Sequence, residues 1–207
     1  MQRAKRIISQ IVEAPQPATP VKQVARLTQQ PAAIHQSFQR TNPVLSQDFI
    51  DYLKTVENGS KAGYKNGRWF PHADPSGGYN IGYGHHLQST EEYNQLVKTG
   101  LSNDQVNDLL AKDVFSAQKT VDDYIQRRYK VKLHLEPKQY QMLIDYVFNI
   151  GNLDGFPKMV DAVIRSDKDG MNKEYKRTGI IRGKKKELTG RNTMFANKFL
   201  AQAESIA

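Results

Sequence analysis

The sequence predicts a mostly helical α+β protein with two lobes: a small antiparallel sheet lobe, a long helix linking the lobes, and a helical C-terminal lobe. Three observations support this fold class. Turn signals and alternating aromatic residues are concentrated in residues 60–86. Apolar residues recur at helical spacing from Val106 to Ile125, and most later segments also have helical patterns.

The sheet lobe is predicted to follow a first helix. Ser46 can cap that helix, whose apolar positions continue to Val56 and which ends at the turn signal ENGS, residues 57–60. Asn66-Gly67 then lies between two aromatic segments, a pattern typical of a tight hairpin. The segment DPSGG, residues 74–78, predicts a second turn, after which YNIGYG continues as an alternating strand.

Helices are predicted for the rest of the chain. Ser102 and Gln105 form a capping-box pattern at the start of a helix of about six turns, long enough to bridge two lobes. Pro137 suits the first turn of a buried helix that Gly151 ends. Shorter helices are expected at about 157–166 and 190–204. The run RGKKKE, residues 182–187, is expected to be a solvated basic loop, with a contact for an anionic polymer as the alternative.

Residues 1–44 differ from the folded domain predicted at 45–207. They hold five of the nine prolines, eight glutamines, six basic residues and one acid, so they carry +5 of the net charge of +9. This composition predicts an extended or partly disordered basic arm. One short helix is expected at Ala4–Glu13, with Ile7, Ile8, Ile11 and Val12 on one face. A solvated tail and a segment that docks on a partner protein are both consistent with this pattern.

Composition also limits the classes of function. The chain has no cysteine, which excludes disulfides and thiolate chemistry. It has no apolar run long enough for a membrane span and no signal-peptide core. The positive charge favours anionic partners, but no groove-reading motif accompanies it, so nucleic acid is not the expected partner.

Two carboxylates are candidates for chemistry. Glu57 ends the first helix, and Asp74 lies beside the glycine-rich hairpin 17 positions later. Two carboxylates on rigid elements at the mouth of a cleft are what glycoside hydrolysis requires, one protonated and one ionised. From spacing alone, solvated surface carboxylates are the more common explanation.

The motifs around these carboxylates resemble a known family. TVENG followed by HADPSGGYNIGYGHHL is similar to the phage-type lysozymes, muramidases of glycoside hydrolase family 24. The later segments SNDQVNDLLAKDV, LIDYVFNIGNLDGF and TGRNTMFANKFL resemble the family's interlobe helix, buried helix and closing segment. The likeness covers about residues 45–205 in the same order and implies a lysozyme-like two-lobe fold.

The resemblance implies roles for individual residues. Glu57 matches the family's acid and Asp74 its second carboxylate, which with Asn80 would position a water and so invert the anomeric centre. Asn80 stands where the family usually has threonine. The implied substrate-binding residues are Tyr79, His86, Phe148, Asn149 and Arg191, and the implied structural pair is His85 with Asp113.

Two other side-chain groups have simpler explanations. The inserted segment GYKNGRWFP adds Trp69 and Phe70, which we expect to pack on the sheet rather than to stack on sugar. No metal or other cofactor is expected, because adjacent His85 and His86 on a strand point to opposite faces and cannot readily bind one ion.

The resemblance implies a peptidoglycan hydrolase that cleaves the β-1,4 bond between N-acetylmuramic acid and N-acetylglucosamine. The arm 1–44 favours an enzyme carried in a phage particle, attached to virion or tail proteins, that acts in the host periplasm or cell wall during genome entry. The alternatives are a free endolysin held in the host cytoplasm before lysis, and a non-catalytic lysozyme-like module that binds the wall.

Overall fold

The computed structural model describes residues 46–74, 77–131, 133–181 and 184–201. The predicted arm 1–44 lies outside the described residues. The first element is helix α3 (Gln47–Asn58). Ser46 caps it as predicted, since its hydroxyl accepts a hydrogen bond from the Phe49 backbone N–H. Phe49, Ile50 and Leu53 form its buried face.

The sheet lobe follows α3 and confirms the predicted hairpins. Strands β1 (Tyr64–Lys65) and β2 (Arg68–Trp69) pair through Asn66 and Gly67, which both have positive φ, as a two-residue hairpin of this kind requires. Strands β3 (His72–Ala73), β4 (Tyr79–Ile81) and β5 (His85–His86) form a second antiparallel sheet in the order β3-β4-β5. Helix α4 (Thr90–Thr99) completes the lobe.

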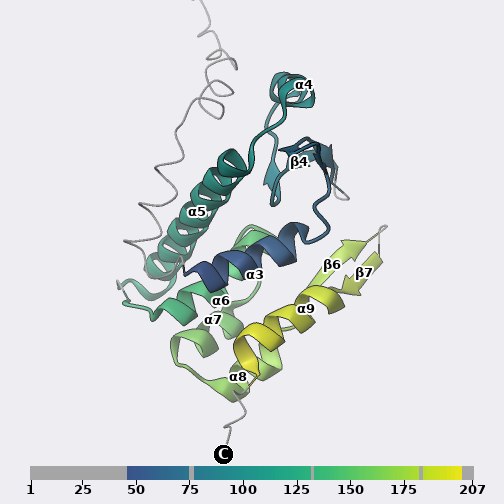
Figure 1. The fold of residues 1–207 in the computed structure, drawn as a ribbon. Helices are drawn as coiled ribbons and strands as arrows, with labels where there is room; N and C mark the ends of the chain where they lie inside the picture. Colours follow the sequence, from purple (N-terminus) through teal and green to yellow (C-terminus); the bar gives the residue numbers. More distant parts are fainter. Residues whose placement is uncertain (1–45, 75–76, 132, 182–183, 202–207) are drawn as a thin grey trace, which may run out of the picture.

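Helix α5 (Asn103–Tyr129) joins two separate hydrophobic cores (Figure 1). It has 27 residues and is therefore about 40 Å long. Its first turns supply Val106 and Leu109 to the core of the sheet lobe, and later positions from Leu110 to Ile125 pack into the helical lobe. The capping box of Ser102 and Gln105 is present as predicted.

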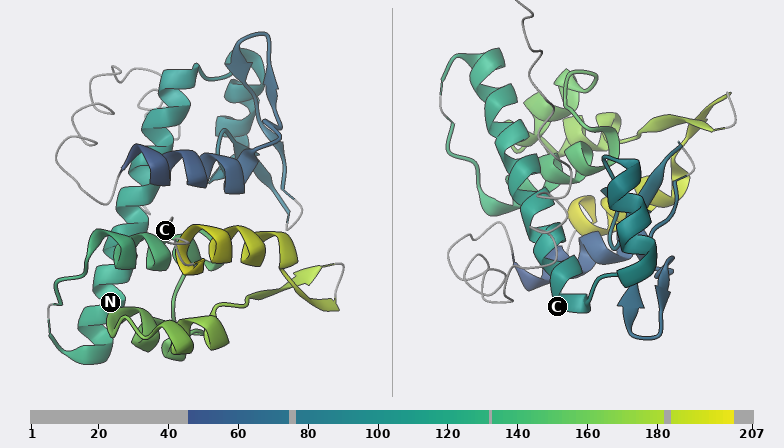
Figure 2. Two further views of the ribbon diagram at one scale, coloured as in Figure 1. Left: turned by 60° about the horizontal axis from the view of Figure 1, so that its bottom comes forward. Right: turned by 90° about the horizontal axis from the view of Figure 1, so that it is seen from above.

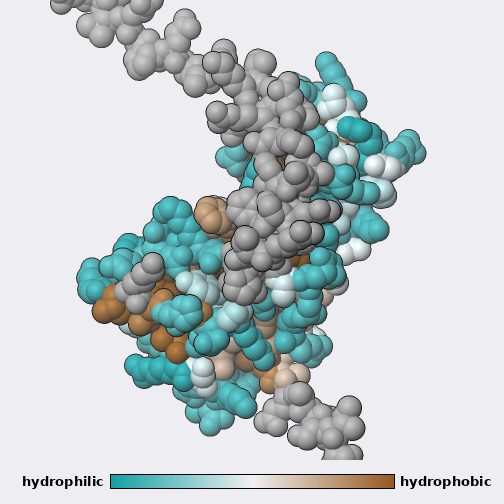
Figure 3. Space-filling view, turned by 60° about the vertical axis from the view of Figure 1, so that its left-hand side comes forward, coloured by the Kyte–Doolittle hydropathy of each residue, from teal (hydrophilic) through white to brown (hydrophobic). Residues whose placement is uncertain are grey.

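The helical lobe packs against one side of the far end of α5 (Figures 1 and 2). It contains α6 (Pro137–Ile150), α7 (Pro157–Ile164), α8 (Lys168–Glu174), α9 (Thr189–Phe195) and a π-helical turn η2 (Ala196–Leu200). Figure 3 shows that hydrophilic residues dominate the drawn face of the sheet lobe, while hydrophobic residues gather over the helical lobe. None of the helices in the described ranges is long and apolar enough to cross a membrane.

The prediction of only helices and loops after the first sheet was wrong at residues 178–187. There β6 (Thr178–Ile181) and β7 (Lys184–Glu187) form a third antiparallel sheet, a two-stranded hairpin. The lysine run is therefore a strand and not a loop. A two-stranded hairpin with four exposed residues in β7 lacks the apolar alternation by which a half-buried strand is recognised. The predicted mostly helical α+β fold is otherwise confirmed, and Trp69 is buried against the sheet lobe as expected.

Asn58 fixes the junction between α3 and the sheet lobe. Its side-chain amide donates hydrogen bonds to the carbonyls of Ala62 (3.0 Å) and Gly82 (2.8 Å). Its side-chain oxygen accepts from the Ala62 backbone N–H at 2.8 Å. The residue is buried, so these backbone groups have little access to water as a substitute. Asn58 thereby holds the end of α3, where Glu57 lies, against the turn between β4 and β5.

We expect Asn58→Ala to lower the free energy of unfolding by about 2–4 kcal/mol, because it leaves several buried backbone groups unpaired. Urea denaturation followed by circular dichroism measures this change. Thr55→Ala on the exposed face of the same helix is the control, with an expected change within about 0.5 kcal/mol. Equal stability of the two variants would show that Asn58 does not hold this junction.

Candidate active site

Glu57 lies in the last turn of α3 and faces the turn between β4 and β5. Only 14% of its side chain is exposed. Gly84 in that turn has a φ of +89°, and a Cβ atom built on it would lie 3.5 Å from Glu57 Oε2. The glycine therefore lets the backbone take a left-handed conformation, and a side chain at this position would touch the Glu57 carboxyl group.

Arg191 on α9 connects Glu57 to the helical lobe. Its Nη2 atom lies 2.7 Å from Glu57 Oε1 and 3.0 Å from Asp145 Oδ1. The guanidinium is 11% exposed, so solvent screens these contacts only weakly. Arg191 thus bridges a carboxyl group on α3 and a carboxylate on α6.

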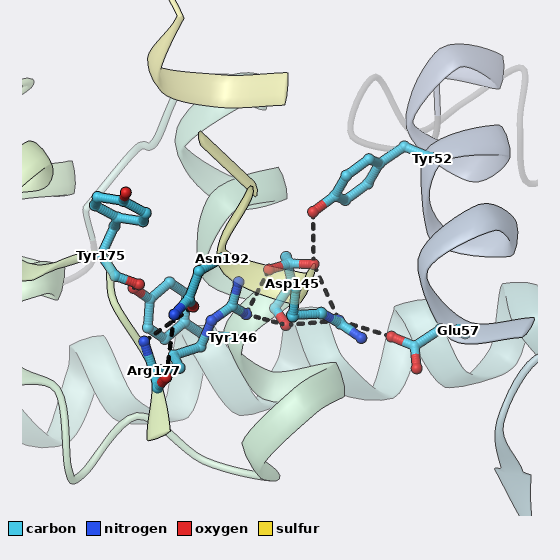
Figure 4. A network of polar contacts seen from close by, with 8 residues as sticks. Tyr52, Glu57, Asp145, Tyr146, Tyr175, Arg177 and Asn192 are labelled. Atoms are coloured by element: carbon cyan, nitrogen blue, oxygen red, sulfur yellow. Dashed lines mark hydrogen bonds and ion pairs between the residues drawn. The ribbon is translucent and has the colours of Figure 1, made fainter. Parts of the chain in front are cut away.

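Asp145 is the centre of a buried polar network that the sequence analysis missed (Figure 4). Besides Arg191, it accepts hydrogen bonds from Arg177 Nη1 at 2.6 Å and from the Tyr52 hydroxyl at 3.0 Å. Asp145 and Arg177 are both fully buried. The sequence contains one signal of this network, which is a single acidic residue inside the apolar run LIDYVF. A charge buried in such a run requires an opposite charge and hydrogen bonds.

Arg177 is held from several sides. Its guanidinium lies 4.5 Å from the centre of the Tyr146 ring and 5.1 Å from that of Phe195. Its backbone N–H and C=O are both hydrogen-bonded by the side chain of Asn192, at 3.0 and 3.1 Å. These contacts fix the cation that neutralises Asp145 and leave Arg191 to be shared with Glu57.

The environment of Glu57 favours its protonated form. Burial raises the pKa of the Glu57 carboxyl, and the charge of Arg191 opposes this without cancelling it. The negative charge of Asp145 adds to the rise, because it repels the ionised form of Glu57. Glu57 therefore combines a raised pKa with a cation positioned to stabilise the carboxylate once the proton is lost.

Asp74 belongs to a second polar group on the sheet lobe. The side-chain amide of Asn80 donates a hydrogen bond to Asp74 Oδ2 at 2.5 Å, and its oxygen lies 3.1 Å from His86 Nδ1. Asn80 pairs with His86 across the sheet, which places these side chains on one face. The Gly77 N–H donates to the Asp74 carbonyl at 3.0 Å and closes the turn beside the carboxylate.

A groove of about 330 Å³ lies between the two lobes, and its lining includes His86 but not Glu57, Asp74 or Asn80. It is lined by Gly84, His85 and His86 of the sheet lobe, by Asp113 and neighbours on α5, and by Val147 and Phe148 on α6. Gly84 therefore borders both the groove and Glu57. A larger cavity of about 490 Å³ lies between α6, α8 and η2, and none of the predicted site residues lines it.

Three of the predicted substrate-binding residues, Tyr79, Asn149 and Arg191, lie outside this groove lining. Tyr79 precedes Asn80 on β4 and so points to the opposite face, where its ring lies 4.0 Å from that of Tyr93. The structure therefore does not bring Tyr79 to the Asp74 group. Asn149 is half-buried on α6, and its Oδ1 atom has no hydrogen-bond partner among the described residues.

His85 and Asp113 are in contact as expected, and they join the sheet lobe to α5. His85 Nδ1 lies 3.0 and 3.1 Å from the two Asp113 carboxylate oxygens. Burial lowers the pKa of His85, but the hydrogen bond and charge of Asp113 outweigh it, so the pKa is raised overall. In the part of the chain that the structure describes, no three histidine or carboxylate side chains are grouped so as to hold a metal ion.

Asp145→Asn is expected to lower the free energy of unfolding by about 3–5 kcal/mol, because it leaves the buried Arg177 without a counter-charge. Asp154→Asn, which removes an exposed ion pair with Arg127, is the matched control and should change it by at most about 1 kcal/mol. Chemical denaturation measures both. A loss for Asp145→Asn no larger than that of the control would exclude Asp145 as the centre of the network.

Asp113→Asn is expected to lower the pKa of His85 below its ordinary value, since burial remains and the carboxylate is gone. In the unmodified protein the raised pKa stabilises the fold below the ordinary histidine pKa, and this contribution disappears as pH rises through the raised value. An NMR titration of the imidazole measures the shift, with Asp123→Asn on the exposed face of α5 as control. A His85 pKa unaffected by Asp113→Asn would mean that the pair does not form in solution.

Comparisons with known proteins indicate the family of the chain. A scan of protein-family models matches the phage lysozyme family over residues 64–192, a range that includes Asp74, Asn80, Asp145 and Arg191 and begins after Glu57. The search of curated proteins gave no significant match. Among solved structures, the chain is similar to the muramidase domain of SpmX from Asticaccaulis excentricus, with 19% identity and a TM-score of 0.45 over 75% of this chain and 97% of that one. The family match covers more than half of the sequence, and the chain therefore belongs to the phage lysozyme family.

Proposed function

We propose that this protein is a muramidase that hydrolyses the β-1,4 bond between N-acetylmuramic acid and N-acetylglucosamine in peptidoglycan. Family membership supports peptidoglycan hydrolysis as the class of activity. The observation that carries the proposal is Glu57, a largely buried carboxyl group with a raised pKa next to Gly84, which lines the interlobe groove. A protonated acid at this position is what cleavage of a glycosidic bond requires.

Glu57 acts as the general acid. It donates its proton to the glycosidic oxygen as the bond to the leaving sugar breaks. The product of this step is a Glu57 carboxylate, and Arg191 at 2.7 Å then stabilises the new negative charge. Asp145 keeps that cation from lowering the pKa of Glu57 fully in the resting state, because it binds the same guanidinium.

Asp74 acts as the base. Its carboxylate, held by the hydrogen bond from Asn80, takes a proton from a water that attacks the anomeric carbon. Attack on the face opposite the leaving group inverts the anomeric centre. His86 orients Asn80 through the other end of its amide, so Asn80 is a positioning residue for Asp74.

A non-catalytic wall-binding module is the second candidate, and the same Asn80 favours it. Both ends of its amide are engaged within the protein, one by Asp74 and one by His86, so Asn80 has less capacity to hold the attacking water than a free side chain would have. The two candidates differ in whether the wall is cut or only bound.

We further propose a virion-associated enzyme that opens the host wall during genome entry, with a free endolysin as the alternative. This proposal rests on the composition of residues 1–44, which is basic and rich in proline and glutamine and suits an attachment segment. Removal of these residues would abolish incorporation into phage particles and leave wall cleavage intact if the arm is an attachment segment.

Glu57→Gln is expected to reduce clearing of purified peptidoglycan by about 100-fold or more, because the amide cannot donate a proton as the acid does. In the unmodified enzyme, activity should extend above the ordinary glutamate pKa and fall as pH rises through the raised pKa of Glu57. Turbidity measurements across pH test both statements. Lys54→Gln on the same helix is the control and should clear peptidoglycan normally.

Two outcomes would contradict the proposal. If the unmodified protein binds peptidoglycan without clearing it, the non-catalytic module is correct. If the products end in anhydro-muramic acid instead of reducing muramic acid, the enzyme is a transglycosylase, which uses Glu57 but no attacking water.

A further inference from the structure

The hairpin of β6 and β7 carries a cationic surface that the proposed catalytic mechanism does not use. Lys184, Lys185 and Lys186 are all exposed, and none forms an ion pair with another described residue. Glu187 is the one acid of the hairpin sequence, and it is engaged by Asn192 at 3.3 Å and by Lys176 at 4.0 Å. The three lysines therefore keep their charges available to an external partner.

The hairpin is fixed to the residues that position Glu57. Its first strand follows Arg177 and its second strand leads into α9, which carries Arg191. Both arginines bind Asp145, and Arg191 also contacts Glu57. At the base of the hairpin, the Leu188 N–H donates to the Arg177 carbonyl at 3.0 Å. The lysines are thus held at a set position relative to the proposed general acid.

The hairpin also projects from the body of the protein. Figures 1 and 2 show it extending from α9 on the side of the helical lobe that faces the sheet lobe. Alternation along β7 places Lys184 and Lys186 on one face and Lys185 on the other. Charges on both faces of a projecting hairpin suit insertion into an anionic mesh better than contact with one flat surface.

We propose that Lys184, Lys185 and Lys186 bind the free carboxylates of peptidoglycan stem peptides next to the glycan strand being cleaved. This proposal rests on the proposed function, because it takes peptidoglycan as the polymer in the groove. Flexible lysine ammonium groups suit carboxylates whose spacing varies from one stem to the next. Each exposed pair is weak, but an insoluble wall presents many carboxylates at once, so several weak contacts add to a useful affinity.

Binding to purified Gram-negative sacculi, which contain no teichoic acid, tests the proposal. The parent protein is the full chain with Glu57→Gln, so that binding is measured without cleavage. Lys184→Gln, Lys185→Gln and Lys186→Gln are combined in one variant. The matched control combines Lys98→Gln, Lys138→Gln and Lys173→Gln, three exposed lysines outside the hairpin without ion pairs to described residues. Equal melting temperatures of the parent, the hairpin variant and the control variant would show that the added substitutions leave the fold intact.

We expect the hairpin variant to bind sacculi about tenfold more weakly than the parent at about 50 mM salt, with little difference at about 500 mM. The control variant should bind like the parent. Sacculi whose carboxylates have been converted to amides should bind the parent as weakly as native sacculi bind the hairpin variant. These three results together would support the stem-peptide carboxylates as the partner.

Other results would overturn the proposal. Equal binding of native sacculi by the hairpin and control variants would exclude the lysines as a binding surface. Undiminished binding of amidated sacculi by the parent would exclude carboxylates, and a loss seen only with a DNA duplex would assign the surface to nucleic acid. The proposed catalysis is tested separately, because the binding assay requires no cleavage. It would be refuted if the unmodified protein, which keeps Glu57, failed to clear peptidoglycan.

Discussion

The buried carboxylate of Asp145 is the interaction on which the geometry of the candidate site depends. It draws together Tyr52 from α3, Arg177 from the segment before β6, and Arg191 from α9. A buried charge of this kind is costly unless its partners are all in place, so it favours a single arrangement of these elements. Glu57 is positioned by that arrangement, because it contacts one of the same arginines.

The same network reconciles two requirements on Glu57 that oppose one another. A general acid must keep its proton before the reaction, which burial favours, and its carboxylate must be tolerated afterwards, which a cation favours. Arg191 supplies the cation, and Asp145 offsets part of its charge. Burial at the end of α3 alone would retain the proton but not stabilise the carboxylate, and Arg191 alone would do the reverse. The proposed acid therefore depends on a residue in the middle of α6 that does not contact it directly.

Much of the fold could be predicted from the sequence because its signals are local. Ser46, the Asn66-Gly67 turn and the Ser102–Gln105 capping box each determine a boundary within a few residues. Glu57, Asp74 and Asn80 were identified through motif resemblance. The Asp145 network was missed because its members are 93 and 32 positions apart in sequence and meet only through tertiary packing. The β6–β7 hairpin was missed because an exposed lysine run carries no burial pattern.

The β6–β7 hairpin and the Asp145 network, which were not predicted from the sequence, are connected in the structure to the predicted acid Glu57. The hairpin lies between Arg177 and Arg191, the two arginines that Asp145 binds. An exposed hairpin has little core of its own, so its orientation is set by these anchors at its base. The buried ion pairs thus position an acid on one side and a cationic surface on the other. Conversion of Asp145 to a neutral residue would therefore disturb both the acid and the hairpin, so the proposed glycan cleavage and the proposed wall contact both depend on one buried charge.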